Sequence, residues 1–288
     1  MEKIKERIAW FKEERPIYRE ILDFYAQVLE EQGRVRPQLK IRALDLDKKL
    51  VKSRQHSGVP LLQREEFEID LEAAKGLFHA LCLIGQGATQ KMGEEIPKIV
   101  KVLQNDKLNL EHLLSRHYDG DYLDQEAERW GFDMGIFFFL VKASVRPSLE
   151  AQMEQLRGSI DLEEWLQRYC PICGSSPQMA ELRDEGGKRY LQCSLCGCHW
   201  RWERLACPYC HNKAFDSLHY LFSEEEEAYR VDLCDRCKGY IKTVDSRKLD
   251  YEPYLDLEDV VTIHLDLLAL EKGYKRPVPT PWGPMIVK

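Results

Sequence analysis

The sequence predicts an α+β protein in which an all-helical N-terminal domain precedes two consecutive four-cysteine ribbons and a C-terminal helix. Nine of the ten cysteines lie between Cys170 and Cys237, and Cys82 precedes them. Apolar residues recur at helical spacing up to about residue 165, and short β-type segments around turns follow. This change predicts a helical bundle at 1–165, four-cysteine modules at 166–203 and 204–250, and a C-terminal helix with an extended tail at 251–288.

Composition narrows the class of protein. The chain has 288 residues, of which 44% are hydrophobic and 32% charged, as in folded globular proteins. No apolar run approaches the roughly 20 residues of a membrane span, and the charged N-terminus resembles no secretory signal. We therefore expect a cytoplasmic protein without membrane insertion, in which cysteines serve as thiolate ligands more often than in disulfides. The net charge of −7 argues against a nucleic-acid partner.

Six to nine helices are expected before residue 165. Pro16 suits the first turn of one helix and Gly33 the residue past its end, and Asp70 caps the next. Pro147 starts a later helix, and Asp161 caps the last one. The other helical segments are 94–103, 109–118 and 133–145, and residues 55–69 are expected to form a loop that docks an apolar elbow.

Strands and one helix are expected after the boundary. The strand segments are 178–183, 188–193, 217–223, 228–234 and 239–245. Residues 184–187 carry a hairpin signal, and the acidic run 224–227 predicts a solvated hairpin tip. An amphipathic helix over 256–274 should stop at Gly273, before a proline-rich, extended tail.

A Cys-x-x-Cys turn occurs four times in this region. The pairs are Cys170 and Cys173, Cys193 and Cys196, Cys207 and Cys210, and Cys234 and Cys237. Cysteines three residues apart in a tight turn direct both sulfurs to one point, and two such turns complete a tetrahedron that zinc or iron accepts. The residue after the second cysteine often needs a positive φ, which Gly174 and Gly197 can provide. The pattern predicts two metal ions, each held by four cysteines.

The gaps between the turns suggest how they pair. Nineteen residues separate Cys173 from Cys193 and twenty-three separate Cys210 from Cys234, whereas ten separate Cys196 from Cys207. Each longer gap accommodates a β-hairpin, so we pair the first turn with the second and the third with the fourth. An interleaved arrangement, first with third and second with fourth, stays open at this point.

Competing interpretations of the cysteines are weaker. Disulfides do not suit a chain without an export signal, and a thioredoxin-like pair needs a βαβ context that the sequence lacks. A ribbon of about 35 residues buries too little apolar surface to fold alone, so a metal would supply folding free energy. A closed four-thiolate site leaves no coordination position for a substrate, which argues against an enzyme.

Other chemistry-bearing residues have plainer explanations. Cys198 is either a spare buried thiol or an exchangeable ligand that competes with Cys196. Cys82 lies on an apolar helix stripe and is expected in the core. The nearby histidines are expected on the surface or in packing, and the aromatic residues in the ribbon core or a docking face: His199, His211 and His219, and Trp200, Trp202 and Tyr240.

Three segments together carry a family resemblance: 169–177 (YCPICGSSP), 189–210 (RYLQCSLCGCHWRWERLACPYC) and 233–245 (LCDRCKGYIKTVD), followed by the 256–274 helix. They resemble the FdhE family of formate dehydrogenase accessory proteins, in the order and spacing of all four cysteine pairs. Trp200, four residues after the second pair, and Tyr240, three after the fourth, also match. The resemblance is specific over about residues 168–275, and Cys198 departs from the pattern.

The resemblance implies a cytoplasmic maturation factor, not an enzyme. It would bind the catalytic subunit of a respiratory formate dehydrogenase before export by the twin-arginine route. It implies rubredoxin-like iron centres, with zinc as the alternative metal, ligated by Cys170, Cys173, Cys193, Cys196, Cys207, Cys210, Cys234 and Cys237. Loops such as 175–178 and 211–215 would form a docking face, and homo-oligomer formation is left open.

Two other functions remain as alternatives. The chain could be a small iron–thiolate redox protein that carries electrons through two centres. It could also be a zinc-ribbon regulator that binds nucleic acid, but the region from Cys170 to Tyr240 holds nine Lys and Arg against eleven Asp and Glu. Two divalent metals with eight thiolates would bring its charge to about −6, which repels phosphate.

Overall fold

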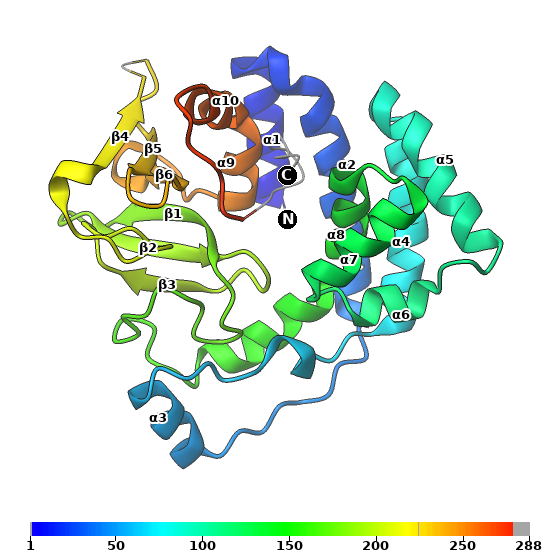
Figure 1. The fold of residues 1–288 in the computed structure, drawn as a ribbon, viewed down its shortest axis with the longest axis horizontal. Helices are drawn as coiled ribbons and strands as arrows, with labels where there is room; N and C mark the ends of the chain where they lie inside the picture. The colour runs from blue at the N-terminus through cyan, green and yellow to red at the C-terminus, as the bar shows by residue number, and fades with distance from the viewer. Residues whose placement is uncertain (1, 224, 279–288) are drawn as a thin grey trace. The chain divides into compact units, whose positions relative to one another are not determined.

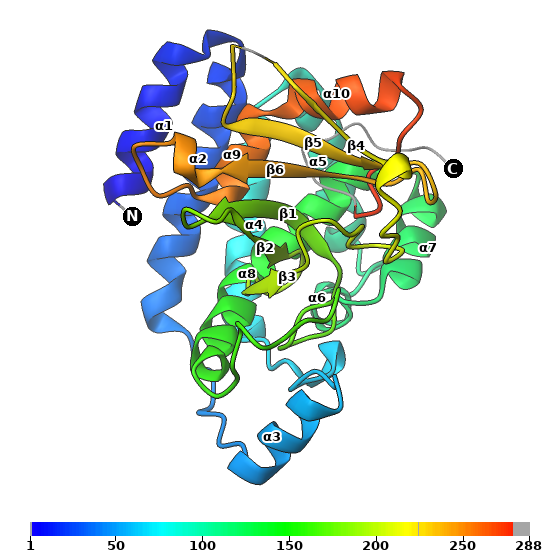
Figure 2. The ribbon, with the colours of Figure 1, turned by 90° about the vertical axis from the view of Figure 1, so that its left-hand side faces the viewer.

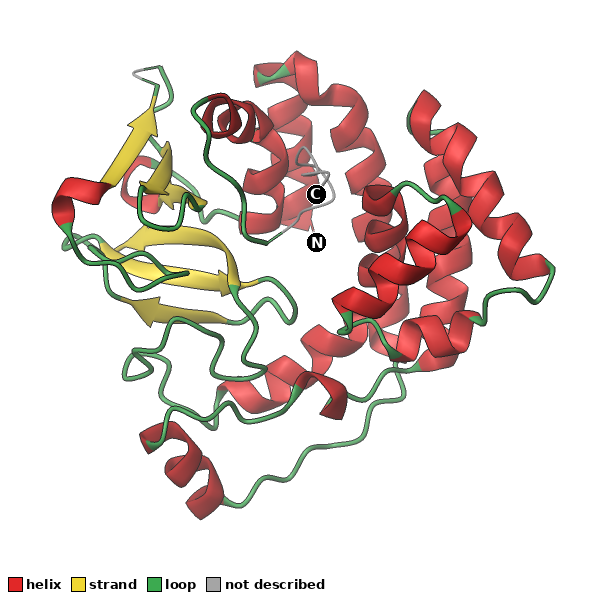
Figure 3. Ribbon diagram, viewed as in Figure 1, coloured by secondary structure: helices red, strands yellow, loops and turns green. Residues whose placement is uncertain are grey.

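The computed structural model describes residues 2–223 and 225–278, which fall into two compact units. Unit 1 comprises Met1–Ala43 and Glu65–Gln152, and unit 2 comprises Leu44–Arg64 and Met153–Lys288. Figure 1 labels their helices and strands, and Figure 3 distinguishes them by colour. The two units do not meet at the expected domain boundary, residue 165. Residues 44–64 and 153–165 belong to unit 2, which contains the sheet.

Unit 1 is helical. Its helices are α1 (Glu2–Glu14), α2 (Arg19–Val35), α4 (Leu71–Gln86), α5 (Gln90–Gln104), α6 (Leu110–Ser115), α7 (Gly120–Trp130) and most of α8 (Met134–Arg157). The side chain of Asp70 accepts a hydrogen bond from the Ala73 N–H and caps α4, as predicted. Cys82 is buried in the stripe of α4 that also contains Leu77 and Leu81, which confirms its assignment to the core. None of the helices in the described residues is long and apolar enough to cross a membrane.

The prediction that Pro147 starts a helix was wrong, because Pro147 lies inside the continuous helix α8. A proline at this position cannot donate to the carbonyl four residues earlier, that of Ala143. Gln32 of α2 donates to that carbonyl through Nε2 at 2.8 Å. A side chain from another helix thus replaces the missing backbone hydrogen bond. The sequence of α8 by itself does not indicate this partner.

The helix expected after Asp161 does not form: residues 162–164 make a turn, and irregular chain with a bend at 168–169 follows. The carbonyl of Leu162 accepts the N–H of Arg201 from the sheet at 3.1 Å, so it is not available to a helix. Trp165 is buried, and its Nε1 donates to the carbonyl of Tyr169 at 2.7 Å. This segment leads the chain into the first cysteine turn.

Residues 44–64 contact the first cysteine turn as well. They contain helix α3 (Lys48–His56) and the expected apolar elbow, whose Leu61 and Leu62 are buried. The N–H groups of these leucines donate to the carbonyls of Pro171 and Ile172 at 2.9 and 2.8 Å. The elbow therefore docks on the first cysteine turn by backbone pairing.

Unit 2 is built on one six-stranded sheet. Its strands are β1 (Pro177–Arg183), β2 (Lys188–Cys193), β3 (His199–Trp202), β4 (Leu218–Phe222), β5 (Tyr229–Cys234) and β6 (Tyr240–Asp245), in the order β3-β2-β1-β6-β5-β4. β1 and β6 pair in parallel, from Met179 opposite Lys242 to Leu182 opposite Asp245, and the other neighbours are antiparallel. The two predicted four-cysteine modules thus share a continuous sheet, whose strands run side by side in Figure 2.

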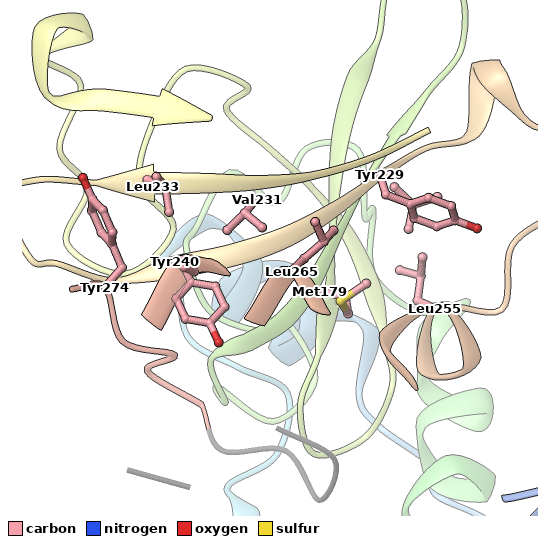
Figure 4. Close-up of a cluster of buried hydrophobic side chains, with 10 residues drawn as sticks. Met179, Tyr229, Val231, Leu233, Tyr240, Leu255, Leu265 and Tyr274 are labelled. Carbon is pink, nitrogen blue, oxygen red and sulfur yellow. The ribbon is translucent and has the colours of Figure 1, made fainter. Parts of the chain in front are cut away.

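Helices α9 (Leu255–Val261) and α10 (Ile263–Glu271) pack on one face of this sheet. Alternate side chains of β5 and β6 point toward them, as Figure 4 shows for Val231, Leu233 and Tyr240 against Leu255 and Leu265. The single helix predicted over 256–274 was wrong, since the chain breaks at Thr262. The break leaves the carbonyls of Asp259 and Thr262 to accept from Lys242 of β6, at 2.8 and 3.3 Å. Gly273 ends the helix at φ 83°, as predicted, and the tail lies mostly outside the described residues.

Candidate metal centre

The four cysteine turns share one backbone pattern. In each turn the N–H of the first cysteine donates to the carbonyl five residues later. The pairs are Cys170 with Ser175 at 2.9 Å, Cys193 with Cys198 at 2.8 Å, Cys207 with Asn212 at 2.9 Å, and Cys234 with Gly239 at 3.0 Å. The same four-residue sequence pattern therefore produces the same local structure at all four places.

The residue that follows each second cysteine adopts a left-handed conformation. Its φ is 69° at Gly174, 72° at Gly197, 58° at His211 and 54° at Lys238. The positive φ expected for the two glycines is confirmed, and the third and fourth turns adopt it without glycine. A non-glycine residue in this region costs about 1–2 kcal/mol, which the surrounding contacts must offset.

The folded chain brings the turns together in pairs. The sulfurs of Cys170, Cys173, Cys193 and Cys196 lie within 4.8 Å of one another, as do those of Cys207, Cys210, Cys234 and Cys237. The predicted pairing of first with second and third with fourth is thus the one that forms, and the interleaved arrangement does not. We call these groups the first and the second four-cysteine centre.

The spacing of the sulfurs fits a tetrahedral metal ion. Each centre has two short contacts, at 3.6 and 3.3 Å in the first and 3.7 and 3.6 Å in the second. A metal–sulfur distance of about 2.3 Å places the corners of a tetrahedron about 3.8 Å apart. Each centre could therefore hold one metal ion.

The first centre is enclosed by protein. All four of its cysteines are buried, and burial raises the pKa of the Cys170 and Cys196 thiols because the interior disfavours charge. Backbone N–H groups nevertheless approach sulfur, from Ile172 to Cys170 at 3.4 Å and from Leu195 to Cys193 at 3.3 Å. Such donors stabilise thiolates, and a bound cation would favour the ionised form further.

The second centre is more open to solvent. Cys210 is half-buried and Cys237 is exposed, whereas Cys207 and Cys234 are buried. Asn212 approaches the centre from its own turn, with Nδ2 at 3.6 Å from the sulfur of Cys234 and 2.7 Å from the hydroxyl of Ser217. The sequence pattern did not single out Asn212, although its position two residues after Cys210 could have indicated it.

The remaining candidates lie outside both sulfur groups. Cys198 is buried, and its sulfur is 3.7 Å from the carbonyl of His199. His211 packs on the ring of Trp202, and His219 pairs with Asp235 at 2.8 Å. Trp200, Trp202 and Tyr240 are buried in the sheet layer, as predicted for core aromatics.

Four thiolates fill the coordination shell of zinc or of a rubredoxin-type iron. A closed site of this kind cross-links the surrounding loops, and with iron it can also exchange one electron. The fold and the site together define the class of protein: a helical unit followed by a single sheet that carries two four-cysteine centres.

Comparison with known proteins identifies the family. The family model described as "FdhE, central domain" matches residues 169–204, and "FdhE, C-terminal domain" matches residues 205–282. The protein called "Protein FdhE homolog" of Aquifex aeolicus (strain VF5) is 30% identical over 271 residues, which cover 93% of this chain and 90% of the relative. The chain therefore belongs to the FdhE family.

Other relatives agree with this assignment. The homolog from Stutzerimonas stutzeri (strain A1501) is 36% identical over 125 residues, 39% of this chain and 37% of that protein. A solved structure, described as the crystal structure of the FdhE protein from Pseudomonas aeruginosa, has a similar fold. Its TM-score is 0.65 at 22% identity, with 96% of this chain and 92% of that chain covered.

Proposed function

We propose that this protein is a maturation factor for a respiratory formate dehydrogenase and binds its catalytic subunit in the cytoplasm, before export. The observation that carries the proposal is the pair of four-cysteine centres on one sheet in a chain of this family. Closed thiolate centres hold loops in place for contact with another protein, and they offer no open coordination position to a substrate. The proposal therefore assigns the protein a binding role and no catalysis of its own.

Each centre would hold one ion of iron or zinc. The eight ligands would be Cys170, Cys173, Cys193 and Cys196 in the first centre and Cys207, Cys210, Cys234 and Cys237 in the second. Either metal would contribute folding free energy by joining the paired cysteine turns. Iron would add one-electron chemistry, and the exposure of Cys237 puts the second centre within reach of a partner.

The surface near the second centre suits a protein partner. Large apolar side chains are exposed around its turns, with Leu205 at 77% and Phe215 at 87% exposure. Exposed apolar groups of this size often mark protein-binding surfaces. Phe215 belongs to the 211–215 loop that was expected to form a docking face, so we place the subunit contact here.

Co-purification tests the proposal. The tagged protein is isolated from cells grown and lysed without oxygen, the catalytic subunit is detected, and iron and zinc are measured in the same sample. We expect the wild-type protein to retain the subunit and Phe215→Ser to retain much less of it, with metal content unchanged. Leu83→Ser is the matched control, because Leu83 is also a large apolar side chain with high exposure, at 73%, but belongs to α4.

A second set of variants tests the role of the centres. Cys170→Ser combined with Cys173→Ser should lose the metal of the first centre and the subunit, whereas Cys198→Ala should keep both. Retention of the subunit by the double variant would contradict a role for the centre in binding. Absence of the subunit from wild-type protein with both centres filled would contradict the proposal as a whole.

An electron-carrier role is the second candidate, because Cys237 is an exposed potential ligand of the second centre. A protein that carries electrons would contain iron at that centre and would be reduced and reoxidised without a bound subunit. Zinc in both centres of protein isolated without oxygen would exclude this role.

A further inference from the structure

A small pocket lies beside the second four-cysteine centre. It has a volume of about 220 Å³, and its lining includes Arg189, Arg204, Arg230, Asp232 and Tyr220, together with Cys207. Arg230 and Asp232 alternate along β5 with Val231 and Leu233, which face α9 and α10. Because successive strand residues point to opposite faces, the pocket lies on the sheet face that these helices leave free. We call it the arginine pocket.

Arg189 is a buried cation in the wall of this pocket. Its side chain is 3% exposed, and one guanidinium nitrogen, Nη1, donates to the carbonyl of Ala206 at 3.1 Å. The other two, Nε and Nη2, are buried without a hydrogen-bond partner, although Nη2 lies 3.2 Å from Asp232 Oδ2. A buried guanidinium with unused donors is costly. Both atoms are covered by protein, so a ligand that accepts from them needs a small movement of the pocket wall and would then be stabilised.

The arginines of the lining outnumber its carboxylates. Asp232 is shared, because its Oδ1 lies 2.9 Å from Nε of Arg230 and its Oδ2 accepts from the hydroxyl of Thr243 at 2.7 Å. One carboxylate therefore stands against three arginines in the lining, of which Arg204 donates through Nη1 to the carbonyl of Gly186 at 3.2 Å. Arg230 also lies over the ring of Tyr220, with 5.3 Å between its guanidinium carbon and the ring centre.

We propose that the arginine pocket binds a single carboxylate group. The planar fork of a guanidinium matches the two oxygens of a carboxylate, and the volume suits one small acid or one side chain. A dianion fits less well, because a divalent metal with four thiolates would add two negative charges beside Cys207 and Cys234, which both line the pocket. The carboxylate belongs either to a free small acid or to an Asp or Glu side chain of a bound protein.

This assignment does not depend on the proposed function. The pocket would bind a carboxylate whether or not the protein accompanies a formate dehydrogenase subunit. If the carboxylate comes from a bound protein, the pocket adds a charged anchor beside the exposed Tyr220, Leu205 and Phe215. An NMR titration with a small acid measures binding in the pocket alone, so a negative result there leaves the co-purification result unaffected.

The test is an NMR titration of the metal-loaded, full-length protein with ¹⁵N-labelled arginine. The probe is N-acetyl-aspartate amide, and the matched neutral probe is N-acetyl-asparagine amide. We expect saturable shifts of the Nε–H signals of Arg189 and Arg230 with the acidic probe, and none with the neutral one. Arg230→Gln should weaken binding at least about tenfold, because it removes a charged donor.

Two further variants keep the test informative. Arg201→Gln is the control, since Arg201 is a partly exposed arginine of β3 that does not line the pocket. Arg230→Lys keeps the charge but loses the planar fork of the guanidinium, so it should bind the probe more weakly than wild type. It replaces Arg230→Gln if that variant fails to fold.

The outcomes distinguish the source of the carboxylate. Shifts with acetate as strong as with the aspartate probe would identify a free acid as sufficient, and shifts with the aspartate probe alone would favour a side chain. Absence of saturable shifts, or equal shifts with the neutral probe, would overturn the assignment.

Discussion

Lys242 and Asp266 form an ion pair in the interior of unit 2, with 2.6 Å between Nζ and Oδ2 and 1% of each side chain exposed. Asp259 lies 2.8 Å from the same Nζ, and Nη1 of Arg276 contacts both carboxylates at 2.8 and 3.1 Å. Tyr240 also donates to Asp266 at 2.8 Å. Two cations and two anions thus join β6, α9, α10 and the segment after α10 into one neutral network.

Removal of the lysine should be strongly destabilising. In Lys242→Met two buried carboxylates would face one arginine, and loss of one partner of a buried pair typically costs about 3–5 kcal/mol. We expect a decrease of this size in the free energy of unfolding, measured by denaturant titration of the metal-loaded protein. Lys213→Met is the control, because Lys213 pairs with Glu203 at an exposed site worth at most about 1 kcal/mol. Equal losses in the two variants would contradict the role of the network.

The two four-cysteine centres should release their metals at different rates. Exposed Cys237 and half-buried Cys210 admit a chelator to the second centre, whereas the first centre is buried on all four cysteines. We expect two phases of equal amplitude when a chelator is added to metal-loaded protein, recorded by the absorbance of the metal–chelator complex. Cys237→Ser should abolish the fast phase and Cys193→Ser the slow one. A single phase for wild-type protein would show that the centres do not differ in this way.

The bond between Gln32 and the carbonyl of Ala143 should be coupled to Pro147. Gln32→Ala leaves a buried carbonyl without a donor, which costs about 1–3 kcal/mol. Pro147→Ala restores a backbone N–H that can donate to the same carbonyl, so Gln32→Ala should cost less in that background. A double-mutant cycle of unfolding free energies measures the coupling. Additive effects of the two substitutions would mean that Gln32 does not replace the missing backbone bond.

The helical unit should lose stability in mild acid through His117. The side chain is 2% exposed, and burial lowers its pKa to about 4, while its Nδ1 lies 3.0 Å from the carbonyl of Leu114. The unfolded chain, with an imidazole pKa of about 6.5, takes up a proton first as the pH falls. Stability from the neutral imidazole is therefore complete above about pH 6.5 and decreases toward pH 4, by about 3 kcal/mol in total.

The measurement compares wild-type protein with His117→Leu. Free energies of unfolding of the helical unit are determined at several pH values between the unfolded and folded pKa values. The wild-type value should fall more steeply than that of the variant, which has no group to protonate at this position. Parallel curves for the two proteins would show that His117 does not contribute to the acid sensitivity.

Local patterns predicted much of unit 2. The four Cys-x-x-Cys turns, the hairpins between paired turns and the helix stop at Gly273 all depend on residues a few positions apart. Backbone geometry over such short spans is set by residue type, as the shared bond from Cys170 to Ser175 and from Cys207 to Asn212 illustrates. The pairing of the turns also followed, because a hairpin needs a minimum length between its ends.

Long-range pairing could not be predicted in the same way. The parallel contact of β1 with β6 joins segments some sixty residues apart, and it depends on which edges remain free after both hairpins have formed. The elbow of Leu61 and Leu62 was expected to dock, but its partner, the first cysteine turn, could not be read from spacing. Pro147 stays in a helix only because Gln32 lies opposite Ala143.

The sequence by itself determined the four cysteine turns, the two sulfur groups that they form and the family to which the chain is similar, because each rests on short-range spacing. Only the tertiary structure decided that both centres share one sheet, that Lys242 lies among buried carboxylates, and that Arg189 and Arg230 line one pocket. These features depend on contacts between distant segments, and such contacts form where packing and charge are satisfied jointly, which no single stretch of sequence specifies.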